Sequence, residues 1–180
     1  MGAQKADRKK IFQIMWSPTQ PNTFMSVGVE HIFCWTAPNL SKKRASNMPQ
    51  SKPGQKLGFP SLAFTRSGLA LIAGSDGAVY GFQGGARSKV FKGVHAKMVS
   101  CITSVPDPSN SGNEIVITGG ADKKIICHVL DSAKNLNKVF EFTVDSTPRS
   151  VDFMGDQILT GLSNGSILEF KGVITNPSQP

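Results

Sequence analysis

The sequence is poor in cysteine: its 180 residues include only Cys34, Cys101 and Cys127, and no C-x-x-C pair. Each cysteine lies in an apolar stretch, where a reduced cysteine behaves as a small hydrophobe, so no disulfide framework is expected. Long hydrophobic runs are also missing, since none approaches the roughly 18 apolar residues of a membrane span. These absences predict a cytoplasmic protein in a reducing compartment, without a signal peptide or membrane contact.

The sequence also lacks the short motifs of common enzyme classes. It has no G-x-x-x-x-G-K-[ST] phosphate loop, no G-x-S-x-G nucleophile turn and no H-E-x-x-H zinc motif. Cys127 and His128 are adjacent, but neighbours in a strand point to opposite faces and cannot easily share one metal ion. We therefore predict no enzymatic activity, cofactor, metal or small-molecule substrate.

Acidic residues are scarce in the first third of the chain. Residues 1–60 hold nine Lys and Arg against two acidic residues, which is +7, whereas residues 61–180 hold eleven against ten, which is +1. A regional excess of this kind indicates attraction to an acidic surface, such as a nucleic acid, an acidic protein or an anionic membrane. It says little about the fold.

Helical periodicity is absent as well, and the sequence offers a repeat instead. Four times, a short apolar run is followed by a turn, a second run ending in glycine, a tight polar turn and a third run. The glycines that close the second runs are Gly28, Gly74, Gly120 and Gly161, so the spacings are 46, 46 and 41 residues. The steady period argues against chance similarity of isolated strands.

Each run is four to eight residues long and rich in Val, Ile, Phe and Thr, which is typical of β-strands. Asp76-Gly77 and Asn164-Gly165 join the second and third runs of two copies, and such pairs accept the positive φ of a tight hairpin. A period in the low to middle forties with three or four strands per copy predicts an all-β propeller of about four blades. The predicted blades span 11–36, 59–83, 93–130 and 148–171, with a basic tail at 1–10, a basic inter-blade loop at 37–58 and a C-terminal tail at 172–180.

The copies resemble WD repeats. In the third copy, Gly93-Val94-His95 precedes the first strand, Thr118 lies in the second strand and Asp122 in the hairpin turn. The resemblance implies a structural role for His95, Thr118 and Asp122, whose side chains bond one another and tie the hairpin to the loop that enters the blade. The closing Trp of the repeat is present only as Trp35, and Phe82, His128 and Phe170 replace it in the other copies.

The order of these degenerate copies is similar to that of the echinoderm microtubule-associated protein-like family. That family reads W-x-x-x-x-P-N before a strand and then G-x-x-H-I-x-F/C-W, and a basic segment follows. The matching residues here are Trp16, Pro21, Asn22, Gly28, His31, Ile32 and Trp35, followed by Lys42, Lys43 and Arg44. The resemblance covers residues 11–171 and implies a microtubule-associated scaffold located on the cytoskeleton.

The family's first propeller needs about seven blades, and full-length members add a coiled coil and a second propeller. The present sequence supplies four blades, and these resemble the latter part of the first propeller of that family. We therefore expect an incomplete or open propeller, and a chain that is a fragment of a longer protein or associates with itself through open blade edges.

The basic stretch between the first two blades is the candidate partner site. It has two interpretations: a flexible loop that meets the acidic face of tubulin, or a solvated insertion without a partner, which is the commoner case. Its basic residues are Lys42, Lys43, Arg44, Lys52 and Lys56.

The predicted function is thus a non-catalytic scaffold that binds microtubules or tubulin-associated complexes. The alternative is a general adaptor whose protein partner docks on the narrow face of the propeller. Nucleic-acid binding is the weaker hypothesis, because strand positions in the inter-blade core already account for the aromatic residues that would stack on bases. Those residues are Phe33, Phe64, Phe82, Phe140, Phe153 and Phe170.

Overall fold

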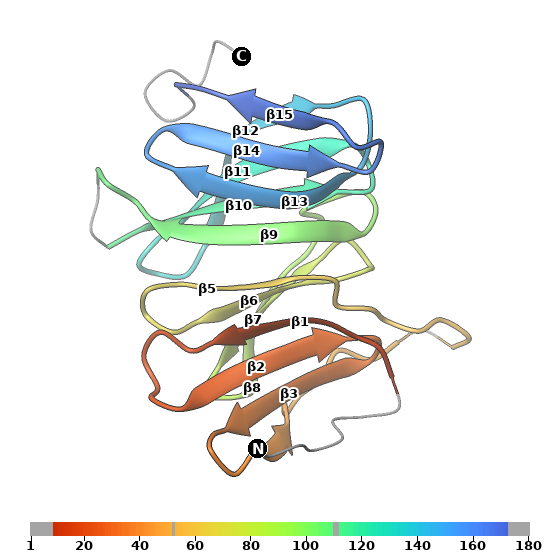
Figure 1. Cartoon of the computed structure of the whole chain (residues 1–180), viewed down its shortest axis with the longest axis vertical. Coiled ribbons are helices and arrows are strands. Elements are labelled where there is room, and N and C mark those ends of the chain that lie inside the picture. Colours follow the sequence, from red (N-terminus) through yellow and green to blue (C-terminus); the bar gives the residue numbers. More distant parts are fainter. Residues whose placement is uncertain (1–8, 52, 110–111, 173–180) are drawn as a thin grey trace.

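The computed structural model of the chain describes residues 9–51, 53–109 and 112–172. Within these ranges the chain forms four antiparallel sheets, which we call blades 1 to 4 (Figure 1). The predicted all-β fold with four blades is confirmed. No helix in the described part of the chain could span a membrane.

Each blade is a meander of neighbouring strands. Blade 1 contains β1 (Ile11–Trp16), β2 (Thr23–Gly28), β3 (His31–Thr36) and β4 (Ser41–Arg44). Blade 2 contains β5 (Leu62–Phe64), β6 (Ala70–Ala73), β7 (Val79–Gln83) and β8 (Ala86–Phe91). Blade 3 contains β9 (Val99–Pro106), β10 (Glu114–Gly120), β11 (Lys124–Leu130) and β12 (Leu136–Thr143). Blade 4 contains β13 (Pro148–Met154), β14 (Gln157–Leu162) and β15 (Ile167–Phe170).

The tight turns between the second and third strands have the backbone that the sequence predicts. Each contains a residue with positive φ: Glu30 at 48°, Gly77 at 84°, Lys123 at 64° and Gly165 at 88°. Glycine reaches this region without steric cost, whereas Glu30 and Lys123 reach it despite their Cβ atoms. The hairpin is therefore the constant part of the repeat, although its sequence varies.

The blades are stacked along the longest axis of the molecule, with blade 1 at one end and blade 4 at the other (Figure 1). Successive residues of a strand point to opposite faces, so each blade can pack on two neighbours. Three apolar clusters fill the three junctions. Their centres include Ile32, Phe59 and Phe82 between blades 1 and 2, Leu71, Val99 and Val116 between blades 2 and 3, and Ile117, Ile125 and Ile158 between blades 3 and 4.

The structure corrects the predicted boundaries at the outer strands. Residues 41–44, expected within a flexible loop, form β4 and pair with β3, while β8 and β12 extend blades 2 and 3 beyond their predicted ends. All four residues of β4 are exposed and polar, so no apolar run marks the strand. The outermost strand of a blade faces solvent, and its pairing partner fixes it without a hydrophobic signal. Lys52 and most of both predicted tails lie outside the described residues.

Candidate interaction surface

An aromatic row covers the face of blade 1 that points away from blade 2. Trp16 and Phe24 have ring centroids 5.0 Å apart, and Phe24 and Trp35 stack at 5.7 Å with nearly parallel planes. Phe33 continues the row at 6.3 Å from Trp35. Phe33, expected in an inter-blade core, therefore lies on the end face of the described stack.

Hydrogen bonds fix Trp35 in this row. The indole Nε1–H donates to Ser26 Oγ at 2.7 Å, and Ser26 Oγ lies 2.7 Å from His31 Nε2. All three side chains are buried. The closing tryptophan is thus held by a serine and a histidine of its own blade, and no sequence pattern marks the role of Ser26.

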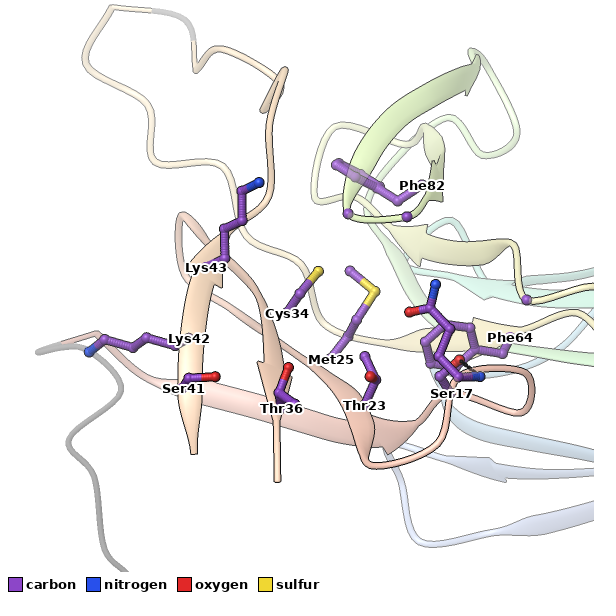
Figure 2. Close-up of a pocket in the computed structure, with 14 residues that line it drawn as sticks. Ser17, Thr23, Met25, Cys34, Thr36, Ser41, Lys42, Lys43, Phe64 and Phe82 are labelled. Atoms are coloured by element: carbon purple, nitrogen blue, oxygen red, sulfur yellow. Dashed lines mark hydrogen bonds between the residues drawn. The ribbon is translucent and has the colours of Figure 1, made fainter. Parts of the chain in front are cut away.

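The basic strand β4 lies beside the aromatic row. The ammonium of Lys42 lies 5.9 Å from the Trp35 ring and 6.0 Å from the Phe33 ring, both within cation–π range. Lys43, the next residue, points to the opposite side of the strand and lines a cleft between blades 1 and 2 (Figure 2). Because of this alternation, β4 presents positive charge on both of its sides.

The cleft has a volume of about 280 Å³. Met25 and Cys34 point into it from blade 1, and Phe64 and Phe82 line it from blade 2 (Figure 2). Burial raises the pKa of the Cys34 thiol, although the Lys43 ammonium partly opposes this shift. A thiol with a raised pKa is a poor nucleophile at neutral pH. Among the described residues, no group of three or more His, Cys, Asp or Glu side chains is placed to hold a metal ion.

Three further basic residues, Lys9, Arg44 and Lys56, lie near the carboxylate of Glu30, in the turn between β2 and β3. Lys9 Nζ lies 2.6 Å from Glu30 Oε2, and this hydrogen bond holds the pKa of Glu30 below its ordinary value. The charges of Lys56 and Arg44 act in the same direction, so both lie close to Glu30. Residues 31–75 contain no Asp or Glu at all. Among the described residues from 9 to 58, Glu30 is the one acidic residue, so positive charge exceeds negative charge in blade 1 and in the segment that follows it.

The structure brings His95, Thr118 and Asp122 together in blade 3. His95 Nδ1 lies 2.8 Å from Asp122 Oδ1, and His95 Nε2 lies 3.0 Å from Thr118 Oγ1. The backbone N–H of Ala96 donates to Asp122 Oδ2 at 2.9 Å. The network ties the hairpin turn at 121–123 to the loop that enters the blade. The Thr118 hydroxyl is completely buried, as expected for a structural network.

Burial lowers the pKa of His95, although the carboxylate of Asp122 favours the protonated ring. Burial alone would raise the pKa of Asp122, but the hydrogen bonds from Ala96 and His95 outweigh it and hold that pKa below its ordinary value. A neutral ring beside an ionised carboxylate satisfies both shifts. The tautomer that fits the two contacts carries its proton on Nδ1, and Nε2 then accepts the hydroxyl proton of Thr118.

Blades 2 and 3 differ from blade 1 at the closing position. In blade 2 the closing residue is Phe82, which is buried in the apolar cluster between blades 1 and 2. Two residues earlier, the phenol of Tyr80 donates to Asp76 and ties the strand to its own hairpin. In blade 3 His128 takes the place in β11 that Trp35 has in β3, and it is buried with an Nδ1 atom that has no hydrogen-bond partner among the described residues. Burial lowers the pKa of His128 to about 4, so its ring is neutral at pH 7.

No protein-family model matches the sequence. Similar folds are found among solved structures. The WD40 repeats of RRP9 superpose with a TM-score of 0.67 at 15% identity, and the WD40 β-propeller domain of Doa1 with 0.68 at 16% identity. The fold is that of a WD40 propeller. Each superposition includes 93% of this chain but only 53% of the other chain. This chain therefore spans about half the length of these structures.

A computationally designed protein, Ika4, matches this chain over nearly the full length of both chains. It superposes with a TM-score of 0.66 at 18% identity, and the match covers 95% of this chain and 99% of the designed chain. Identities below 20% establish the shared architecture only. Membership of the echinoderm microtubule-associated protein-like family, which none of these three structures tests, stays a prediction.

Proposed function

We propose that this chain is a non-catalytic scaffold that binds an acidic protein surface through the basic outer side of blade 1, with microtubules as the specific partner. The observation that carries the proposal is the charge distribution of β4, which presents Lys42 and Lys43 on its two sides and is followed by a stretch without acidic residues. The choice of tubulin as the partner, and of the cytoskeleton as the location, rests in addition on the resemblance of the blade order to the microtubule-associated family.

The exposure of β4 supports a role in binding. Residues 41–44 are all exposed, and β4 is the outer edge of its sheet. An edge strand that carries lysine resists pairing with another strand while it leaves its charges accessible. Attraction between such a strand and an acidic surface is screened by salt, so the affinity should fall as ionic strength rises.

Microtubule co-sedimentation at low and physiological salt tests the proposal. The wild-type chain should pellet with microtubules at low salt and less at physiological salt. A triple variant, Lys42→Glu, Lys43→Glu and Arg44→Glu, should stay in the supernatant. A matched control variant, Lys89→Glu, Lys92→Glu and Lys97→Glu, makes the same change in net charge at other exposed positions and should pellet like the wild type.

Other outcomes distinguish the alternatives. If the wild type and both variants all stay in the supernatant at low salt, the hypothesis of direct microtubule binding is wrong. A partner recovered equally by wild type and triple variant, without salt dependence, favours the general adaptor. Equal losses in the triple variant and its control would indicate non-specific attraction, which is also the expectation for a nucleic-acid binder that has no preference for tubulin.

A further inference from the structure

The two end blades each present one apolar face that no other described blade covers. On blade 1, Ile14 is 64% exposed and Trp16 is 60% exposed. Together with Phe24 they form a small groove of about 80 Å³. On blade 4, Met154 is 79% exposed and Ile167 is 77% exposed. Exposed side chains of this size, gathered on a sheet face, mark an interaction surface.

The strand register places an acidic, an apolar and a second acidic side chain side by side on the exposed face of blade 4. Asp152 pairs with Leu159, and Leu159 pairs with Glu169, so the three side chains share one face. The opposite face packs on blade 3 through Phe153 and Ile158. The exposed face therefore combines apolar residues with two carboxylates.

The two faces are complementary in charge. Blade 1, residues 11–44, contains Lys42, Lys43 and Arg44 against Glu30, which gives +2. Blade 4 with the residue after β15, residues 148–171, contains Arg149 and Lys171 against Asp152, Asp156 and Glu169, which gives −1, and Lys171 Nζ lies 3.3 Å from Glu169 Oε2. The Lys42 ammonium lies over the aromatic row of the exposed blade 1 face, so its charge belongs to the same surface as Trp16 and Phe24.

We propose that two copies of this chain associate through their end blades, with blade 1 of each copy packed on blade 4 of the other, to form a closed ring of eight blades. The opposite charges of the two end faces support a second copy as the occupant. The chain superposes on about half of a WD40 structure, so two copies supply about the chain length of one such structure. The contact joins two different surfaces, and a ring of two copies forms both contacts at once.

The molar mass in solution tests the proposal directly. The monomer mass is 19.3 kDa, and light scattering combined with sedimentation should give twice this value across a dilution series. Because the faces carry opposite charges, raising the salt concentration should increase the dimer dissociation constant several-fold. A stable monomer would overturn the proposal and leave further blades, of a longer form of this chain or of another polypeptide, as the occupant. A mass that keeps growing with concentration would overturn the closed ring, because it indicates open chains of copies.

Two variants test which faces meet. Ile14→Glu places a carboxylate on the blade 1 face, opposite the acidic face of blade 4, and Leu159→Lys places an ammonium on the blade 4 face, opposite the basic face of blade 1. Each variant alone should be monomeric. An equimolar mixture should regain dimers, because one contact is then unchanged and the other pairs the new glutamate with the new lysine. A contact between two identical faces predicts no such recovery.

Matched controls separate these effects from general changes in the surface. Val139→Glu and Val90→Lys introduce the same charges at exposed apolar positions on the outer strands β12 and β8. Both controls should dimerise like the wild type, and all four variants should keep the circular dichroism of the wild type because the four positions are exposed. Loss of dimers in the controls, or no recovery in the mixture, would overturn the assignment of the two faces.

Discussion

The imidazole of His95 lies 2.8 Å from the carboxylate of Asp122, a residue 27 positions later in the chain. His95 precedes the first strand of blade 3, and Asp122 lies in the turn between the second and third strands. The bond therefore closes the blade across β9 and β10, and it is buried on the His95 side. It is the connection on which we expect the stability of blade 3 to depend most.

The first prediction concerns the loss of this carboxylate. Asp122→Ala removes the acceptor of the His95 bond and of the backbone N–H of Ala96. Hydrogen bonds to a charged group contribute about 1.5–3 kcal/mol, so the free energy of unfolding should fall by about 2 kcal/mol. Urea denaturation measures the loss. The control is Asp131→Ala, which removes an exposed turn carboxylate bonded to Asn135 and should change stability much less. Equal losses in the two variants would contradict the special role of Asp122.

The second prediction concerns Gly120, which closes β10 beside this network. A Cβ atom at position 120 would lie 2.2 Å from His95 Nδ1 and 2.5 Å from Asp122 Oδ1. Gly120→Ala should therefore displace one of the two groups and lower the free energy of unfolding by about 1–3 kcal/mol. Denaturant titration against Gly58→Ala provides the comparison, because the nearest atom to a Cβ at position 58 is Ser75 Cβ at 3.8 Å. A Gly120→Ala protein as stable as the control would show that the network can relax.

The sequence predicts the repeat, the strands and the hairpins because each depends on local chemistry. Glycine at 28, 74, 120 and 161 and the alternation of apolar residues recur in every copy, and the structure follows them. The outer strand β4 is not predicted from the sequence because its residues, Ser41 to Arg44, are all polar and exposed and form no apolar pattern in the sequence. Pairing with β3, and not its own composition, determines that strand.

The hydrogen-bond networks of the blades are less predictable than the strands, because some of them depend on strand register and not on a sequence motif. The spacing of His95, Thr118 and Asp122 follows the WD repeat, and the structure brings the three side chains together. Blade 1 builds a different network from Ser26 and His31, which lie five residues apart on either side of a hairpin. Only the register of β2 and β3 shows that these two side chains share a face.

The third prediction concerns the cysteine thiols. Burial raises the pKa of Cys101 to about 11 and that of Cys127 to about 12, whereas Cys34 is partly buried and lines the cleft between blades 1 and 2. Alkylation requires the thiolate and access to it. We expect Cys34 to react first in the native protein and all three thiols to react together in denaturant. Mass spectrometry of labelled peptides identifies the order, and in Cys34→Ser the first label should disappear. Early labelling of Cys127 would contradict the packing of blades 3 and 4.

The fourth prediction concerns His128 and the dependence of stability on pH. Burial lowers the folded-state pKa of this ring to about 4, against an ordinary value of 6.5. Between these two values the unfolded chain binds more protons than the folded protein, so the stabilisation from the neutral ring is complete above pH 6.5 and is lost as the pH falls towards 4. The difference in pKa corresponds to a loss of about 3 kcal/mol across that window.

His128→Leu isolates this contribution. Leucine removes the titrating ring and the Nδ1 atom that lacks a partner among the described residues, and it fits an environment that includes Ile126 and Leu136. The variant should lose less stability than the wild type between pH 6.5 and pH 4, as measured by urea denaturation at several pH values. Some dependence should remain, because burial also lowers the pKa of His95. If the two proteins lose stability in parallel, His128 is protonated in the folded state, and its burial does not keep the ring neutral.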